Sequence, residues 1–170
     1  MPEAYYERTA ITHLDGTLVF GNAQDRARED EAAKELARYW STEKSTCHVN
    51  RFGSLSPIDF FAERDERVVG LLELKGSYAH QKGEDVTYAW LNVRKWLALS
   101  LGQLGMATPA IFVVKFLDGL RWIPLHEIDA SRHRIAGCKK IVKSMSDIEP
   151  VIEVPVANMR IVRPAVAVSR

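Results

Sequence analysis

Three ionisable residues lie at the ends of two apolar segments, where a buried strand would ordinarily carry none. In the stretch SPIDFFAERDERVVGLLELKG, Asp59 follows Pro57 by two residues, and Glu73-Leu74-Lys75 ends the second apolar run. Two carboxylates held close together repel each other unless a cation neutralises them. Because hard oxygen ligands suit Mg²⁺ or Mn²⁺ better than zinc, these residue types predict a divalent-metal site.

The elements that must position these residues are two predicted strands, residues 57–63 and 67–75, joined by a short polar turn. Side chains alternate between the two faces of a strand, so Glu73 and Lys75 share one face. Asp59 lies about as far from the turn as the residues near Glu73 do. The hairpin therefore predicts that the three side chains converge at one end of the sheet, unless a one-residue slip in register turns Asp59 away.

A third carboxylate is expected from residues 23–40, which read as a helix of strong helix formers without glycine or proline. Its alanine, leucine and tryptophan side chains define an apolar stripe, with Glu29 in the middle and Asp25 at the edge. The same helical wheel directs Glu31 and Glu35 towards solvent. A carboxylate on a buried stripe needs a partner, so Glu29 is the third candidate metal ligand and Asp25 its alternative. A helix cap or a surface ion pair would explain Glu29 equally well.

Further elements follow from periodicity and turn signals. Residues 86–104 read as a second helix, which Gly105 is expected to end because glycine favours helix C-termini. Residues 109–125 read as two strands joined by the turn Asp118-Gly119, the strongest hairpin signal in the chain. A weaker signal at Asp15-Gly16 predicts a short hairpin near the beginning.

The C-terminal segment is expected to add short strands, and Pro150 and Pro155 place them at an edge of the sheet. Together these elements predict an α/β fold, with a central mixed β-sheet flanked by helices in a restriction-endonuclease-like core. We expect a single domain over residues 1–170, with its core motifs in residues 25–125 and a C-terminal extension in residues 126–170.

Composition limits the class of protein. Apolar residues make up 46% and charged residues 26% of the chain, which is typical of globular proteins. Residues 90–104 form the longest apolar-rich stretch, but polar residues interrupt it, so no membrane span is expected. No signal peptide is visible, and Cys47 and Cys138 are expected to be reduced thiols of a cytosolic protein. The net charge of +1 neither supports nor excludes a nucleic-acid partner.

The order of these motifs resembles the PD-(D/E)xK nuclease superfamily, and most of all its small phage-type and resolvase-type members. A helix with a Glu is followed by Pro-x-Asp on one strand, Glu-x-Lys on the next strand, and a second helix. The resemblance implies that Asp59 and Glu73 bind the divalent ion, with the backbone carbonyl of Leu74 as a further ligand. It also implies that Lys75 acts beside the attacking water and that Glu29 completes the site.

Members of this superfamily often add a basic or amide residue from the helix that follows the second strand. Arg94 and Lys95 occupy that place. The family pattern favours Lys95, whereas the helical wheel puts Arg94 at the border of the apolar stripe. The alternative for Glu73 and Lys75 is an exposed ion pair at a frayed strand end.

A basic run near the C-terminus is a second candidate for function. The sequence SRHRIAGCKKIVKS has no acidic residue and carries Arg132, Arg134, Lys139, Lys140 and Lys143. These side chains are expected to contact DNA phosphates, or else to form a solvated face that balances the acidic first helix. Of the tryptophans, Trp40, Trp90 and Trp96 are expected in the core, whereas Trp122 is more open to a binding role.

The implied activity is hydrolysis of DNA phosphodiester bonds by a metal-dependent endonuclease, with Mg²⁺ or Mn²⁺ as cofactor and DNA as partner. The resemblance places it in phage or mobile-element DNA recombination, repair or processing, and therefore in the host cytoplasm. Many members are homodimers, an arrangement that suits double-stranded substrates. Two alternatives stay open: a nucleic-acid-binding protein that keeps the nuclease fold without turnover, and an RNA nuclease.

Overall fold

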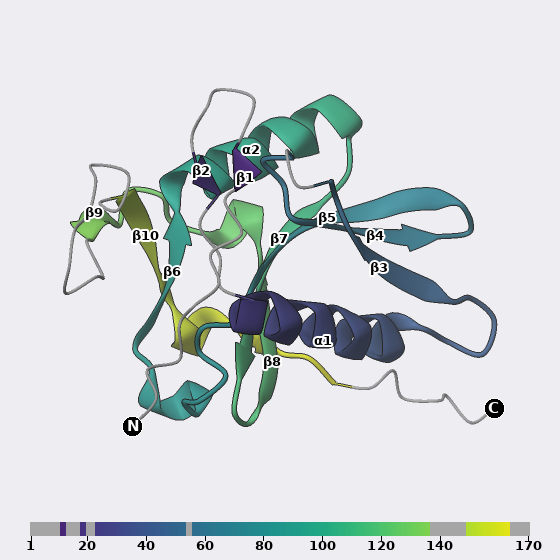
Figure 1. Ribbon diagram of the computed structural model, residues 1–170, viewed down its shortest axis with the longest axis horizontal. Coiled ribbons are helices and arrows are strands. Elements are labelled where there is room, and N and C mark those ends of the chain that lie inside the picture. The colour runs from purple at the N-terminus through teal and green to yellow at the C-terminus, as the bar shows by residue number, and fades with distance from the viewer. Residues whose placement is uncertain (1–10, 13–17, 20–22, 54–55, 137–148, 164–170) are drawn as a thin grey trace.

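A six-stranded mixed sheet forms the centre of the protein in the computed structural model, which describes residues 11–12, 18–19, 23–53, 56–136 and 149–163 (Figure 1). The β5–β7 ladder is parallel, and the other neighbouring strands are antiparallel. In spatial order the strands are β11 (Arg160–Ile161), β8 (Gly119–Pro124), β7 (Ala110–Phe116), β5 (Arg67–Lys75), β4 (Phe60–Arg64) and β3 (Cys47–Arg51).

Helix α1 (Ala23–Trp40) covers one face of this sheet and has the bounds that the sequence predicts. Its buried alanine and leucine side chains pack in one cluster with Leu72 and Leu74 of β5. Because alternate residues of a strand point to opposite faces, Leu71 and Glu73 point away from α1.

The opposite face carries helix α2 (Val93–Met106) and a three-stranded sheet. In this small sheet β10 (Glu149–Pro155) lies between β6 (Tyr88–Asn92) and β9 (His133–Ala136) and is antiparallel to both. Buried side chains of β6 and β10 pack with α2 and Leu71 in a second cluster. The predicted α/β fold, with a central mixed sheet flanked by helices, is confirmed. None of the helices in the described ranges is long and apolar enough to cross a membrane.

Shorter elements complete the chain. Strands β1 (Ile11–Thr12) and β2 (Leu18–Val19) form an antiparallel pair near the beginning, while the predicted turn Asp15-Gly16 lies outside the described residues. Single 3-10 turns connect several strands. They are η1 (Gly83–Asp85), η2 (Leu125–Glu127) and η4 (Val156–Asn158).

The second helix begins later than predicted, because residues 88–92 form β6 instead. Ala89 and Leu91 are buried and Tyr88 is exposed, which is the period-two pattern of a strand that packs on one face. The helix then continues through Gly105, where the sequence predicted its end.

Two-residue turns join the hairpin strands of the large sheet. Asp65 (φ 50°) and Glu66 (φ 60°) both adopt left-handed backbone between β4 and β5, as in a type I′ turn. The β7–β8 turn consists of Leu117 and Asp118, one residue before the predicted position. Gly119 begins β8 at φ 128°, a conformation that favours glycine.

Strand β10 is central in the small sheet, so the edge position predicted from its prolines is wrong. In the described ladders, Pro150 pairs with Ile135 of β9, and Pro155 pairs with Tyr88 of β6. Each proline thus lies at an end of β10 where the ladder has one neighbour. On its other side each proline has no ladder partner, so the missing N–H of the proline costs no hydrogen bond there.

Candidate active site

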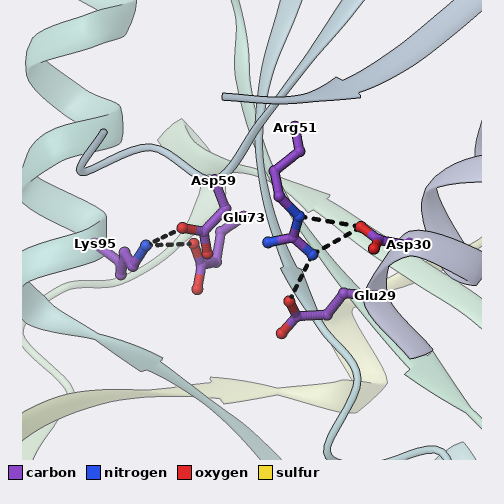
Figure 2. Close-up of polar contacts among 6 residues, drawn as sticks. All are labelled: Glu29, Asp30, Arg51, Asp59, Glu73 and Lys95. Atoms are coloured by element: carbon purple, nitrogen blue, oxygen red, sulfur yellow. Dashed lines mark hydrogen bonds and ion pairs between the residues drawn. The ribbon is translucent and has the colours of Figure 1, made fainter. Parts of the chain in front are cut away.

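Asp59 and Glu73 lie next to each other at the open end of the β4–β5 hairpin (Figure 2). Phe60 of β4 pairs with Leu72 of β5, so the next position along this ladder sets Asp59 opposite Glu73. The backbone N–H of Phe52 donates to the carbonyl oxygen of Asp59 at 2.9 Å, which keeps Asp59 in line with β4. Both carboxyl groups project from the face of the sheet that α2 covers.

A β-bulge sets this register. Near the turn Glu63 pairs with Val68, and a regular ladder continued from there would set Asp59 opposite Leu72 and turn Glu73 to the α1 face. The extra residue, Val69, shifts the pairing by one position between Ala62 and Glu63. Bulges of this kind re-aim side chains beside functional sites, and here the bulge turns Glu73 to the face on which Asp59 lies.

Lys95 of α2 places an ammonium group against both carboxyl groups (Figure 2). Its Nζ donates to Oδ1 of Asp59 and lies 3.6 Å from Oε2 of Glu73. Glu73 is only 5% exposed, so this contact lies in the protein interior. Arg94, the other basic residue predicted here, is exposed. Of the two, Lys95 is therefore the one that reaches the carboxyl pair.

The two carboxyl groups have opposite pKa shifts. Burial raises the pKa of Glu73 well above its usual value, and the charge of Asp59 adds to this. Burial also opposes ionisation of Asp59, but the Lys95 ammonium and the contact with the Glu73 carboxyl outweigh it and lower the pKa of Asp59. Glu73 is therefore the carboxyl group of the pair that takes up a proton more readily, while Lys95 favours the ionised form of Asp59.

Lys75 shares the strand face of Glu73 but reaches towards the small sheet. Its Nζ donates to Oδ1 of Asn92, the last residue of β6, at 3.4 Å. The Lys75 charge also favours the ionised forms of Glu73 and Glu29. Lys75 therefore lies between the carboxyl pair and the end of β6.

Glu29 lies on the far side of the site and is bound by Arg51 (Figure 2). One Nη of Arg51 lies 3.2 Å from Oε2 of Glu29 and 2.9 Å from Oδ1 of Asp30, and Nε donates to the same Asp30 oxygen at 3.0 Å. Burial raises the pKa of Glu29 to about 7, the Asp59 charge adds to this, and Arg51 opposes it. Asp25, the alternative helix acid, has a side chain outside the described part of the structure.

Arg51 is the site residue that the sequence prediction missed. It ends β3 with its guanidinium carbon 4.3 Å from the centroid of the Phe60 ring. In CHVNR, the apolar Cys47 and Val49 alternate with polar residues, and Arg51 continues the apolar face. A cation on the buried face of a strand needs a partner, and this signal could have found it.

The predicted DNA-contacting residues are described only in part. Arg132 precedes β9 and Arg134 lies in it, and both side chains are exposed. The Nε atom of Arg132 lies 3.6 Å from Asp129, and the Nε atom of Arg134 lies 3.0 Å from Glu153. The remaining three, Lys139, Lys140 and Lys143, lie outside the described residues.

The donor chemistry of the carboxyl pair fits a hard divalent cation. Oε2 of Glu73 is buried and accepts no hydrogen bond from the described residues, so this oxygen atom is available as a metal ligand. The position of Lys95 shows that the pair already binds a cation. Within the ranges that the structure covers, no three His, Cys, Asp or Glu side chains are placed to hold one metal ion together. Glu29 is instead held by Arg51, so the site has two carboxyl groups.

Comparisons with known proteins bear on the fold and on the family. A family model described as "Phage putative PDDEXK endonuclease" matches residues 18–162. Among solved structures, the chain is similar to Archaeoglobus fulgidus Hjc, a Holliday junction resolvase from an archaeal hyperthermophile, with a TM-score of 0.52 and 12% identity. The alignment covers 82% of this chain and 93% of Hjc, and at that identity it concerns the fold alone. No curated protein matches the sequence.

Proposed function

The chain belongs to the family of phage PDDEXK endonucleases, and from this premise we propose that it is a metal-dependent deoxyribonuclease whose centre is Asp59, Glu73 and Lys75. The observation that carries the proposal is the buried carboxyl pair at the end of the β4–β5 hairpin, with a lysine from β5 and another from α2 beside it. A structural ion pair would need one carboxyl group, whereas Lys95 here contacts two, the buried Glu73 and the half-buried Asp59.

Asp59 and Glu73 would hold Mg²⁺ or Mn²⁺, with the carbonyl of Leu74 as a further ligand. When bound, the ion would neutralise phosphate charge and lower the pKa of a bound water molecule. Lys95 now contacts both carboxyl groups and would have to move aside for the ion. Its ammonium would then face the phosphate, where a second positive charge would stabilise the transition state.

Lys75 has a separate role in the proposed reaction. It shares the strand face of Glu73, so its ammonium can orient the attacking water and stabilise charge on the phosphate. The 3.4 Å contact with Asn92 keeps its long side chain directed to that place. Glu29 completes the site from α1 once Arg51 releases it, and Arg94 lies near the same end of α2.

DNA is the proposed substrate, and two observations favour a contact through the small sheet. Arg132 and Arg134 are exposed there. Lys139, Lys140 and Lys143 lie in sequence between Ala136 and Glu149, which pair at the end of the small sheet nearest Asn92. The strand residues that flank these lysines in sequence therefore meet at the end of the small sheet nearest Asn92.

The biological setting that we propose is phage or mobile-element DNA recombination, repair or processing in the host cytoplasm. The solved structure with a similar fold is a Holliday junction resolvase, so a four-way junction belongs among the substrates to be tested. A homodimer would place two sites on the two strands of a duplex or junction.

The test is cleavage of supercoiled plasmid, linear duplex, single-stranded DNA, single-stranded RNA and a four-way junction, each with Mg²⁺, Mn²⁺ or EDTA. We expect DNA cutting that requires metal and falls by about 100-fold or more in Lys75→Ala, the usual loss when one such cationic group is removed. Lys115→Ala is the matched control, because Lys115 is also half-buried on a strand and pairs with Glu35 at 2.6 Å, away from the carboxyl pair.

Each outcome has a distinct meaning. Metal-dependent cutting that survives Lys75→Ala would assign the activity to another site or to a contaminant. Binding of DNA without cutting of any substrate would favour the non-catalytic nucleic-acid-binding protein. Cutting of RNA but not of DNA would favour the RNA nuclease.

A further inference from the structure

The three-stranded sheet has one face in the core and one face turned outwards. The side chains of β6 and β10 that belong to the core cluster, Ala89, Leu91, Ile152 and Val154, point towards α2. The residues that alternate with them point away from α2, and Val151 is buried among these. We call this second side the outer face. Trp90 lies on it, is half-buried and belongs to neither core cluster, so the prediction that this tryptophan is a core residue is wrong. The outer face carries Tyr88, Trp90, Asn92, Arg134 and Glu153.

Arg134 and Trp90 form a stacked pair on the outer face. The guanidinium carbon of Arg134 lies 5.0 Å from the centroid of the Trp90 ring. Glu153, which pairs with Trp90 in the ladder, lies 3.0 Å from Nε of Arg134 and holds the guanidinium over the ring. The Arg134 side chain is 54% exposed. The sheet therefore presents a flat cation backed by an aromatic ring.

This stacked pair is continuous with the candidate active site. Asn92 lies two residues beyond Trp90 on the same face of β6, about 7 Å along the strand. Its Oδ1 accepts the hydrogen bond of the Lys75 ammonium at 3.4 Å. The outer face next to Trp90 is therefore within reach of a nucleotide strand that presents its phosphate to Lys75.

We propose that the Arg134–Trp90 pair is a stacking site for an unpaired nucleobase of the DNA substrate, beside the phosphate that is cut. This inference rests on the proposed nuclease function and narrows its substrate class to DNA with unpaired nucleotides at the cleavage point. Aromatic rings and guanidinium planes stack on single-stranded bases, and alanine substitution shows that each stacked base contributes about 1–3 kcal/mol. In a regular duplex the neighbouring base pairs cover both faces of each base, so only a splayed or branched substrate can use the site.

The chain offers a matched control for this pair. Arg160 lies over Trp122 at 4.9 Å and is held by Glu127 at 2.6 Å, so the same three side-chain types recur. This second stack joins β11 to β8, and Trp122 packs against the cluster under α1, on the opposite face of the large sheet. The binding role that the sequence favoured for Trp122 therefore moves to Trp90.

The experiment measures binding by fluorescence anisotropy in EDTA, which prevents cleavage of the labelled DNA. The probes are a blunt duplex and the same duplex with one splayed, unpaired end. We expect Trp90→Leu to weaken binding of the splayed probe by about 5- to 100-fold and binding of the blunt probe by less than about twofold. Trp90→Phe, which keeps an aromatic face, should retain most of the affinity, and Trp122→Leu should change neither probe. Thermal unfolding of each variant checks that it is folded.

Three results would overturn the stacking site. One is an equal loss on both probes in Trp90→Leu, and another is a loss of the same size in Trp122→Leu. The third is a wild-type protein that cuts duplex DNA with metal but binds both probes equally well, which leaves the nuclease function standing. A protein that neither binds nor cuts any DNA would overturn both proposals together.

Discussion

Asp59 and Glu73 illustrate how two carboxyl groups of similar intrinsic pKa take different protonation states when they share a buried site. Lys95 contacts Asp59 more closely than Glu73, and Glu73 is the more deeply buried of the two. Ionised Asp59 then raises the cost of ionising Glu73. The two carboxyl groups therefore differ in their tendency to ionise, and the Lys95 ammonium contacts both of them.

Replacement of Lys95 by Met should strengthen Mg²⁺ binding, because the ion no longer competes with the ammonium group for Asp59 and Glu73. We expect about tenfold tighter binding, which corresponds to an additional rise in Tm of about 3–5 °C at saturating Mg²⁺. In EDTA the same variant should be less stable than the wild type, because a buried carboxylate has lost its partner. Thermal unfolding with and without Mg²⁺ measures both effects. Lys115→Met is the control, and a smaller Mg²⁺ effect in Lys95→Met than in the wild type would contradict the competition.

Glu29 should make the stability of the metal-free protein depend on pH. Its pKa is raised from 4.5 to about 7 in the folded protein, so the folded state holds this proton more tightly than the unfolded chain. The stability that the proton contributes is complete below pH 4.5 and is lost as pH rises through about 7. Glu29→Gln, which cannot ionise, should therefore gain about 1–3 kcal/mol relative to the wild type between acidic and weakly basic pH. Urea unfolding in EDTA at several pH values measures this, and a constant difference would refute it.

Strand β5 shows which parts of the fold were readable from the sequence and which were not. Alternation and turn signals predicted both strands of the β4–β5 hairpin, and the apolar stripe predicted α1. The register between Asp59 and Glu73 depends on Val69, an extra residue whose place in a bulge is decided by packing against the neighbouring strands. Local sequence has no signal for that choice. For Arg51 the strand pattern signals a cation on the apolar face, but not its partners, which come from a helix more than 20 residues earlier.

Helix α2 shows the same limit, because tertiary contacts override local propensity. Trp90 and its neighbours were predicted as the start of the helix, yet they alternate between two faces and pair with β10 as a strand. Conversely, Gly105 lies within the helix although glycine favours a helix end. The left-handed residue that ends α2 is Ala107, at φ 49°, whose N–H donates to the carbonyl of Gln103.

Two single substitutions at the C-terminal end of α2 should therefore stabilise the protein. Ala107→Gly should raise the free energy of unfolding by about 1 kcal/mol, because glycine adopts left-handed backbone without steric cost. Gly105→Ala should raise it by about 0.5–1 kcal/mol, because alanine favours helix and its added Cβ would meet nothing within 4 Å. Urea unfolding of both single variants and of the double variant measures the two effects and any coupling between these neighbouring positions. Destabilisation by either single change would show that α2 ends elsewhere.

Charge in the protein as a whole is nearly balanced, with a net charge of +1, so no strong overall field attracts DNA. Any affinity for the phosphate backbone of DNA must therefore come from basic side chains gathered on one side of the protein. Arg132 and Arg134 lie at the small sheet, on the opposite side of the large sheet from α1. The two sides of the molecule should therefore respond differently to loss of a positive charge.

Arg132→Gln should weaken binding of a blunt duplex and reduce the slope of log K against log salt concentration by about 0.9, the contribution of one phosphate contact. Arg132 and Asp129 are both more than half exposed, so breaking their 3.6 Å ion pair should cost little stability. Arg38→Gln removes the same charge from the last turn of α1 and should leave both affinity and slope unchanged. Titrations of the blunt duplex at several salt concentrations in EDTA measure the slopes. Equal slopes for the two variants would mean that DNA binds without using the small sheet, since one positive charge is lost in each variant and only its position differs.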